Sequence, residues 1–153
     1  MLDTINTFFE RMTGREPNDQ DQELTLELAV AALMCEVMRA DGEMKAIEHQ
    51  TLREMLQRRF RLDDTAVETL VDMAQQEVED AVDHYQFVRL IRDEYDYPQR
   101  VALIGRLWRV AYADSALDPL EEARVRKISE LLYVEHADFI MQKLEVQQAL
   151  GLA

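Results

Sequence analysis

The chain has 153 residues, 48% of them hydrophobic and 31% charged, and its 17 basic against 31 acidic residues give a net charge of −14. This balance is typical of a folded globular chain rather than a disordered one, and the length suits a single domain with a core. The negative charge disfavours nucleic acids and anionic lipids as partners and favours divalent cations and basic proteins.

A location in the cytoplasm is expected by default. The single cysteine, Cys35, excludes an internal disulfide and sits in an apolar run, where it is expected to behave as a small buried residue. The segment 1–12 lacks the basic start and continuous apolar stretch of a secretion signal. The longest apolar run, Leu28 to Cys35, is too short to span a bilayer.

Taken in chain order, the apolar periodicity and the breaks predict helices over 2–12, 22–40, 46–60, about 65–78, about 84–95, 99–112, about 119–132 and about 136–149. Thr65 and Glu68 have the form of a capping box, and Pro98 is expected to end the helix before it. No useful segment alternates with period two. We therefore predict an all-α fold, a single bundle of seven to eight helices, with residues 1–20 as an amphipathic helix and linker and 21–150 as the main domain.

The two halves of the chain resemble each other. Asp41 and Glu48 recur as Asp114 and Glu121 at one constant offset in the numbering, and the apolar positions upstream follow the same shift. The repeat predicts two three-helix halves packed around the nearly all-apolar helices 22–40 and 99–112, with the helix near 84–95 joining them. Whether the ends of the two central helices meet depends on their relative direction, which the sequence leaves open.

The repeated acids have two interpretations. Asp41 ends one helix and Glu48 begins the next, and four such carboxylates from two halves suit a hard divalent cation: Ca²⁺, Mg²⁺ or Mn²⁺. Alternatively they serve as caps and loop anchors, since Asp118 lies three residues before Glu121 as in a capping pair. Lys45, at the same place in the first copy, is a poor cap and explains Glu48 less well.

Other functions have less support. An EF-hand calcium loop fails on spacing, because Val37 and Arg39 stand where its first two ligands belong. No phosphate loop, G-x-S-x-G or H-E-x-x-H motif is present, so we expect no enzyme, with a metal-dependent hydrolase as a weak alternative. Glu36 interrupts its apolar run, and its repeat equivalent Arg109 suggests a salt bridge between the central helices.

At these residues the chain resembles the TerB-like family, named for tellurite resistance protein B. Its A-D-G-x-(x)₄-E pattern stands here as A-D-G-E-M-K-A-I-E, Ala40 to Glu48, and more loosely as A-D-S-A-L-D-P-L-E, Ala113 to Glu121. Ser115 replaces the glycine in the second copy. The resemblance covers about residues 24–148.

The resemblance implies an all-α domain with a divalent-metal site made of Asp41, Glu48, Asp114 and Glu121. It further implies a link to tellurite resistance and stress response, and similar domains occur fused to J-domain co-chaperones. We expect a stand-alone cytoplasmic module that binds a cation and docks onto an unidentified protein partner. The alternative is an interaction domain without metal. The stripe that contains Phe8 and Phe9 either packs on the core or closes a homodimer.

Overall fold

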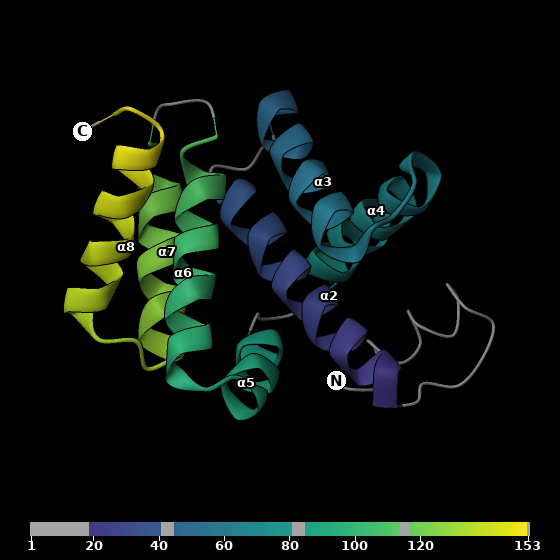
Figure 1. Cartoon of the computed structure of the whole chain (residues 1–153), viewed down its shortest axis with the longest axis horizontal. Coiled ribbons are helices and arrows are strands. Elements are labelled where there is room, and N and C mark those ends of the chain that lie inside the picture. The colour runs from purple at the N-terminus through teal and green to yellow at the C-terminus, as the bar shows by residue number, and fades with distance from the viewer. Residues whose placement is uncertain (1–18, 41–44, 81–84, 114–116, 153) are drawn as a thin grey trace.

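The computed structural model describes residues 19–40, 45–80, 85–113 and 117–152. All regular structure among them is helical, which confirms the all-α class (Figure 1). The helices of these ranges are α2 (Asp19–Met38), α3 (Ala46–Phe60), α4 (Asp64–Asp80), α5 (Tyr85–Glu94), α6 (Tyr97–Ala111), α7 (Pro119–Leu131) and α8 (His136–Ala149). The predicted helix 2–12 and its linker up to residue 18 lie outside the described residues. No described helix is long and apolar enough to cross a membrane.

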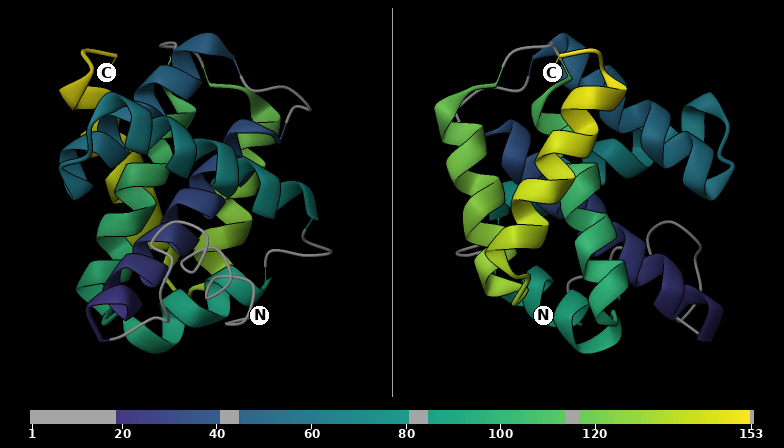
Figure 2. Two further views of the ribbon diagram at one scale, coloured as in Figure 1. Left: turned by 90° about the vertical axis from the view of Figure 1, so that its right-hand side faces the viewer. Right: turned by 60° about the vertical axis from the view of Figure 1, so that its left-hand side comes forward.

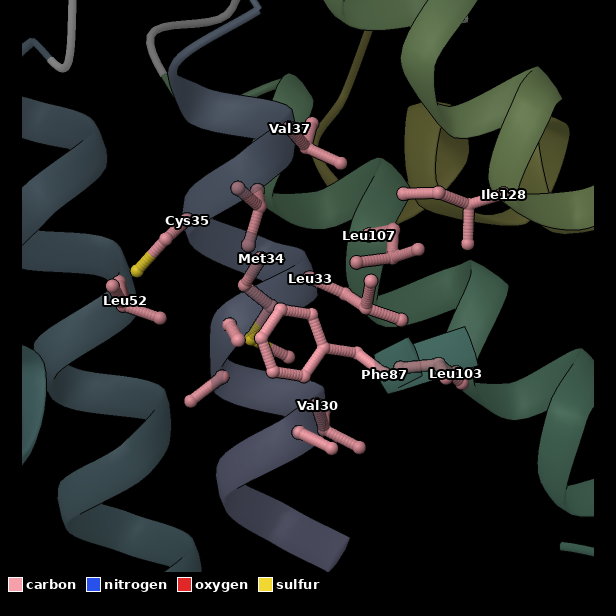
Figure 3. Close-up of a cluster of buried hydrophobic side chains, with 14 of the residues drawn as sticks. Val30, Leu33, Met34, Cys35, Val37, Leu52, Phe87, Leu103, Leu107 and Ile128 are labelled. Atoms are coloured by element: carbon pink, nitrogen blue, oxygen red, sulfur yellow. The ribbon is translucent and has the colours of Figure 1, made fainter. Parts of the chain in front are cut away.

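Helix α2 forms the centre of the bundle, as its apolar sequence predicts. Every residue from Leu28 to Met38 is at most 7% exposed, Glu36 included. The helix packs against α3, α4, α5, α6 and α7. Figure 3 shows Leu33 of α2 close to Leu107 of α6, while Cys35 points toward Leu52 of α3. A helix that is apolar all round needs neighbours on every side, and α2 has them.

The predicted repeat is present in the helix boundaries. The offset between the ends of α2 and α6 equals the offset between the starts of α3 and α7, and the same offset separates Asp41 from Asp114. The offset between the starts of α4 and α8 in the numbering is smaller than this by one residue. That difference agrees with the one-residue deletion that the sequence alignment of the halves requires. Each half is therefore an arrangement of three helices, α2–α3–α4 and α6–α7–α8, with α5 between them.

Backbone detail repeats as well. Arg61 and Tyr133, which are equivalent once the deletion is counted, both take the left-handed conformation, with φ of 55° and 58°. The residue after each donates its N–H to a carbonyl five residues back, at 3.3 Å in the first half and 3.0 Å in the second. This is the hydrogen bond of a Schellman ending, so α3 and α7 stop in the same way.

The halves pack as a pseudo-twofold pair. Helix α2 lies against α6, while α2 contacts α7 and α3 contacts α6, which is the exchange that a twofold relation produces. Both α2 and α6 run toward the same end of the bundle, where α3 and α7 begin (Figures 1 and 2). The C-terminal ends of the two central helices thus lie at one end of the molecule, which settles the direction that the sequence left open.

Two local expectations are corrected. Helix α4 begins at Asp64, and Asp63 is its cap because its carboxylate accepts the N–H of Ala66 at 2.8 Å. Thr65 is therefore inside the helix rather than its cap. Pro98 lies in the first turn of α6 instead of merely ending α5, which stops at Glu94. A proline fits the first turn because the N–H that it lacks has no partner there.

Candidate functional site

Two of the four predicted metal ligands fall on described residues. Glu48 and Glu121 are the third residues of α3 and α7, at equivalent places in the two halves. Each is only 1% exposed. Asp41 and Asp114 lie outside the described residues. The structure thus brings both glutamates to the same end of the bundle and buries both of them.

The helix starts explain part of this placement. Oε1 of Glu48 accepts the backbone N–H of Lys45 at 3.0 Å, and Lys45 itself makes no side-chain cap. In the second half, the Asp118 carboxylate accepts the N–H of Leu120 at 2.7 Å and caps α7. The predicted capping role of Asp118 is therefore confirmed. An acid in the first turn also interacts favourably with the helix dipole.

Capping alone does not require burial, as α6 demonstrates. There Gln99 is the third residue, its side-chain oxygen accepts the Asp96 N–H at 2.9 Å, and the Asp96 carboxylate accepts the Gln99 N–H at 2.9 Å. Gln99 is exposed. Burying a carboxylate is costly unless other groups compensate it, so a glutamate that only capped a helix would be expected at the surface. The burial of Glu48 and Glu121 therefore goes beyond what capping requires.

A charged pair lies near this end of the bundle. Oε1 of Glu36, in the last turn of α2, is 2.9 Å from an Nη of Arg124 on α7, and the side chains are 10% and 35% exposed. The predicted salt bridge of Glu36 with Arg109 is wrong, since Arg109 is exposed on α6. Glu36 does bind an arginine of the other half, but one on α7. Sequence reasoning missed Arg124, although it stands one helical turn after Glu121.

The donor chemistry of this end is that of carboxylate oxygen. Burial raises the pKa of Cys35 to about 12, so the thiol stays protonated at neutral pH. Within the described ranges, no three His, Cys, Asp or Glu side chains are grouped so that they could hold a metal ion. The predicted four-acid set also needs Asp41 and Asp114, which those ranges do not include. Two buried carboxylates and no thiolate fit a hard cation rather than a soft one.

Comparison with known proteins gives one match. A family model described as tellurite resistance protein TerB matches residues 27–144. No curated protein and no solved structure matches the chain significantly. The matched region begins within α2 and ends within α8, so it includes both halves of the repeat and both buried glutamates.

Proposed function

The chain belongs to the tellurite resistance protein TerB family, and from this premise we propose that it is a non-enzymatic cytoplasmic module that binds a divalent cation and takes part in the response to tellurite and related stress. Glu48 and Glu121 are the proposed buried ligands, one from each half. Asp41 and Asp114 complete the proposed set on sequence grounds. The cation is Ca²⁺, Mg²⁺ or Mn²⁺, because these ions prefer carboxylate oxygen.

One observation carries the proposal: the duplicated glutamates are 1% exposed at a helix start, whereas Gln99 has the same capping role and is exposed. A bound cation would be stabilised by two buried carboxylates that the fold brings to one end of the bundle. The net charge of −14 raises the local cation concentration around the whole chain.

Calorimetric titration with each of the three cations tests the proposal. We expect saturable binding, and a rise in the unfolding free energy of about 2.7 kcal/mol when the free ion is at 100 times its dissociation constant. Glu48→Gln and Glu121→Gln keep the side-chain shape and should each weaken binding about tenfold or more. Asp41→Asn and Asp114→Asn test the other two proposed ligands in the same way.

Glu122→Gln is the matched control. Glu122 is the next residue on α7, is partly exposed, and pairs with Lys143 at 3.2 Å. Its substitution removes the same unit of charge beside Glu121, so a general field effect would weaken binding in both variants alike. We expect Glu122→Gln to change the affinity by roughly two- to threefold at most. Absence of binding in the unmodified protein would leave the acids as caps and loop anchors.

Docking of a protein partner is a second function with an observation of its own. Met141 and Leu144 lie on α8 and are each 54% exposed. Their repeat equivalents on α4, Thr69 and Asp72, are polar and exposed, so the fold does not require apolar residues there. An exposed apolar face on a chain of charge −14 suits a basic amphipathic helix.

Fluorescence anisotropy with a labelled leucine–lysine helical peptide tests this second function. The double variant Met141→Ser, Leu144→Ser should lose most of the peptide affinity. The control, Ile47→Ser with Leu120→Ser, removes two other residues of similar exposure, 48% and 56%, and should keep it. Equal binding by all three proteins would mean that charge alone attracts the peptide and that α8 has no docking role.

A further inference from the structure

The outward positions of α8 are spaced like the contact positions of a coiled coil. Residues four, three and four apart along this helix are all exposed: Ala137, Met141, Leu144 and Gln148. Phe139 and Val146, on the opposite side of the helix, are 1% and 4% exposed and belong to the core. Because this spacing returns to the same side of an α-helix, the four exposed residues form one continuous stripe, which we call the α8 stripe.

The equivalent positions of α4 also face solvent but carry different side chains. The four equivalents, all exposed, are Thr65, Thr69, Asp72 and Gln76. The fold therefore turns these positions outward in both halves. On α4 every one of them is polar, whereas the α8 stripe has two large apolar side chains and an alanine. Apolar surface continues beyond α8 at Leu150 and Leu152, each 39% exposed.

The α8 stripe is open in the part of the chain that the structure describes. Helix α8 packs mainly against α6 and also contacts α7. In the right-hand view of Figure 2, α8 lies at the front of the bundle. A helix that is apolar on two opposite sides is normally buried on both, so the stripe is the side of α8 that is available to a second molecule.

The charges beside the stripe indicate what kind of helix fits it. Lys143 is turned toward the bundle, with its Nζ 3.2 Å from Oε1 of Glu122 and 5.4 Å from the centre of the Trp108 ring. Glu145 is exposed beside Leu144, and its carboxylate accepts a hydrogen bond from the Gln142 amide at 3.3 Å. A neutral amide does not compensate the charge. The open side of α8 therefore presents a carboxylate next to apolar side chains.

We propose that the α8 stripe binds one amphipathic helix of another protein, with aliphatic side chains against Met141 and Leu144 and a basic side chain paired with Glu145. This inference rests on the docking function proposed above and adds the binding mode and the residue that selects the charge of the partner. A second copy of this chain fits less well. An antiparallel pair of α8 helices would bring the two Glu145 flanks together, and each chain carries a net charge of −14.

Fluorescence anisotropy with two labelled helical peptides tests the proposal. Both peptides carry leucines at the same four-three spacing, and their remaining positions are lysine in one peptide and glutamate in the other. The unmodified protein should bind the lysine peptide more tightly. Glu145→Lys should weaken binding of the lysine peptide about three- to tenfold and tighten binding of the glutamate peptide. Both changes should shrink at ~1 M salt, which screens exposed charges.

Asp72→Lys is the matched control. Asp72 is exposed on α4, at the repeat equivalent of Leu144, so its reversal changes the net charge as much as Glu145→Lys does but in the other half of the bundle. We expect it to change the affinity for the lysine peptide less than about twofold, because a distant exposed charge is screened. Circular dichroism verifies that both variants keep the helical fold.

The outcomes separate this inference from the function on which it rests. If Glu145→Lys and Asp72→Lys weaken lysine-peptide binding equally while Met141→Ser, Leu144→Ser loses it, docking stands and the role of Glu145 is refuted. If the unmodified protein binds no peptide, or the double serine variant binds as well as it does, docking fails and this inference with it. Sedimentation at the same concentrations should show a monomer. A dimer that the double serine variant separates would assign the stripe to a second copy and overturn the proposal.

Discussion

The two halves of the bundle share their backbone plan and differ in what fills it. Trp108 on α6 and Cys35 on α2 occupy equivalent positions, and so do Phe139 on α8 and Val67 on α4. All four are at most 1% exposed. One half therefore packs two aromatic rings where the other packs a thiol and a small aliphatic side chain. The pattern of buried positions is repeated, whereas the volumes at those positions are not.

The aromatic pair gives the second half a contact that the first half lacks at these positions. The rings of Trp108 and Phe139 lie 5.0 Å apart between centroids, and the indole N–H donates to the Phe139 carbonyl at 3.1 Å. The Cys35 thiol points toward Leu52 instead (Figure 3). The first half also packs against α5, and Phe87 of that helix is 2% exposed. Helix α5 thus packs mainly on the half with the smaller side chains, although it also contacts α7.

The largest expected effect comes from removing the tryptophan ring of the second half. Trp108→Ala removes a fully buried ring together with the indole hydrogen bond to the Phe139 carbonyl, so we expect a loss of about 3–5 kcal/mol in unfolding free energy. Cys35→Ala, at the equivalent position, removes one buried sulfur and should lose roughly 1 kcal/mol. Urea denaturation followed by circular dichroism measures both, because Trp108 is the single tryptophan and its fluorescence disappears with it.

The control for this comparison is Trp108→Phe, which keeps an aromatic ring but not the N–H. It should fall between the other two variants. Equal losses for Trp108→Ala and Cys35→Ala would show that these two positions contribute alike to the unfolding free energy. The difference in side-chain volume between the halves would then not affect stability.

The two halves also differ in which of their helices has a capping side chain at its start. Asp63 caps α4 in the first half and Asp118 caps α7 in the second, each through its carboxylate, at 2.8 Å and 2.7 Å from a backbone nitrogen. Lys45 and Glu135 stand at the starts of α3 and α8 and make no side-chain cap. In each half, therefore, the N-cap side chain caps only one of the two helices that follow the central helix. This helix is α4 in the first half and α7 in the second.

Four substitutions sharpen this contrast with effects of about 1 kcal/mol each. Asp63→Ala and Asp118→Ala should lower the unfolding free energy, because an N-terminal N–H of the helix loses its acceptor. Lys45→Ser and Glu135→Ser should raise it by adding one. Thermal and urea unfolding measure all four. Serine variants that destabilise the protein would mean that Lys45 and Glu135 already stabilise their helix starts by contacts that the serine removes.

Most of the fold could be predicted from the sequence because its signals are local. The starts of α3, α7 and α8 agree with the predicted ones, since each follows a change from loop to apolar periodicity. Helix α6 begins two residues before the predicted 99, because Pro98 suggests a break although Asp96 and Gln99 form a capping box around it. The repeat itself is visible as a constant spacing of acids.

The site could be predicted only in part, because it depends on how the halves pack. The sequence indicates Glu48 and Glu121 by their repetition, but their burial depends on how α3 and α7 pack in the bundle, which no local pattern contains. Arg124 was missed for the same reason. Its partner Glu36 belongs to the other half of the chain, and the repeat points to Arg109, whose side chain is exposed.

The smallest expected effect concerns the hydrogen bonds of Tyr97, which the second half makes and the first half has no equivalent residues to form. The Tyr97 hydroxyl donates to the Asp138 carboxylate and accepts the Glu135 N–H at 3.1 Å, joining the starts of α6 and α8. Ala66 on α4 is the repeat equivalent of Asp138 and has no acceptor in its side chain. The hydrogen bond to Asp138 raises the pKa of Tyr97 above the ordinary 10.0, against the opposing effect of the Glu135 N–H.

A raised pKa means that the folded protein holds the phenol proton more tightly than the unfolded chain does. The resulting stability is fully present below the unfolded pKa of 10.0 and is lost as the pH rises through the higher folded value. Tyr97→Phe should therefore melt at a lower temperature than the unmodified protein near neutral pH, and the difference should shrink above pH ~10. Thermal melts across that range measure it. If the difference in melting temperature stayed constant with pH, the effect of Tyr97 would come from packing, and its hydrogen bond to Asp138 would add no stability.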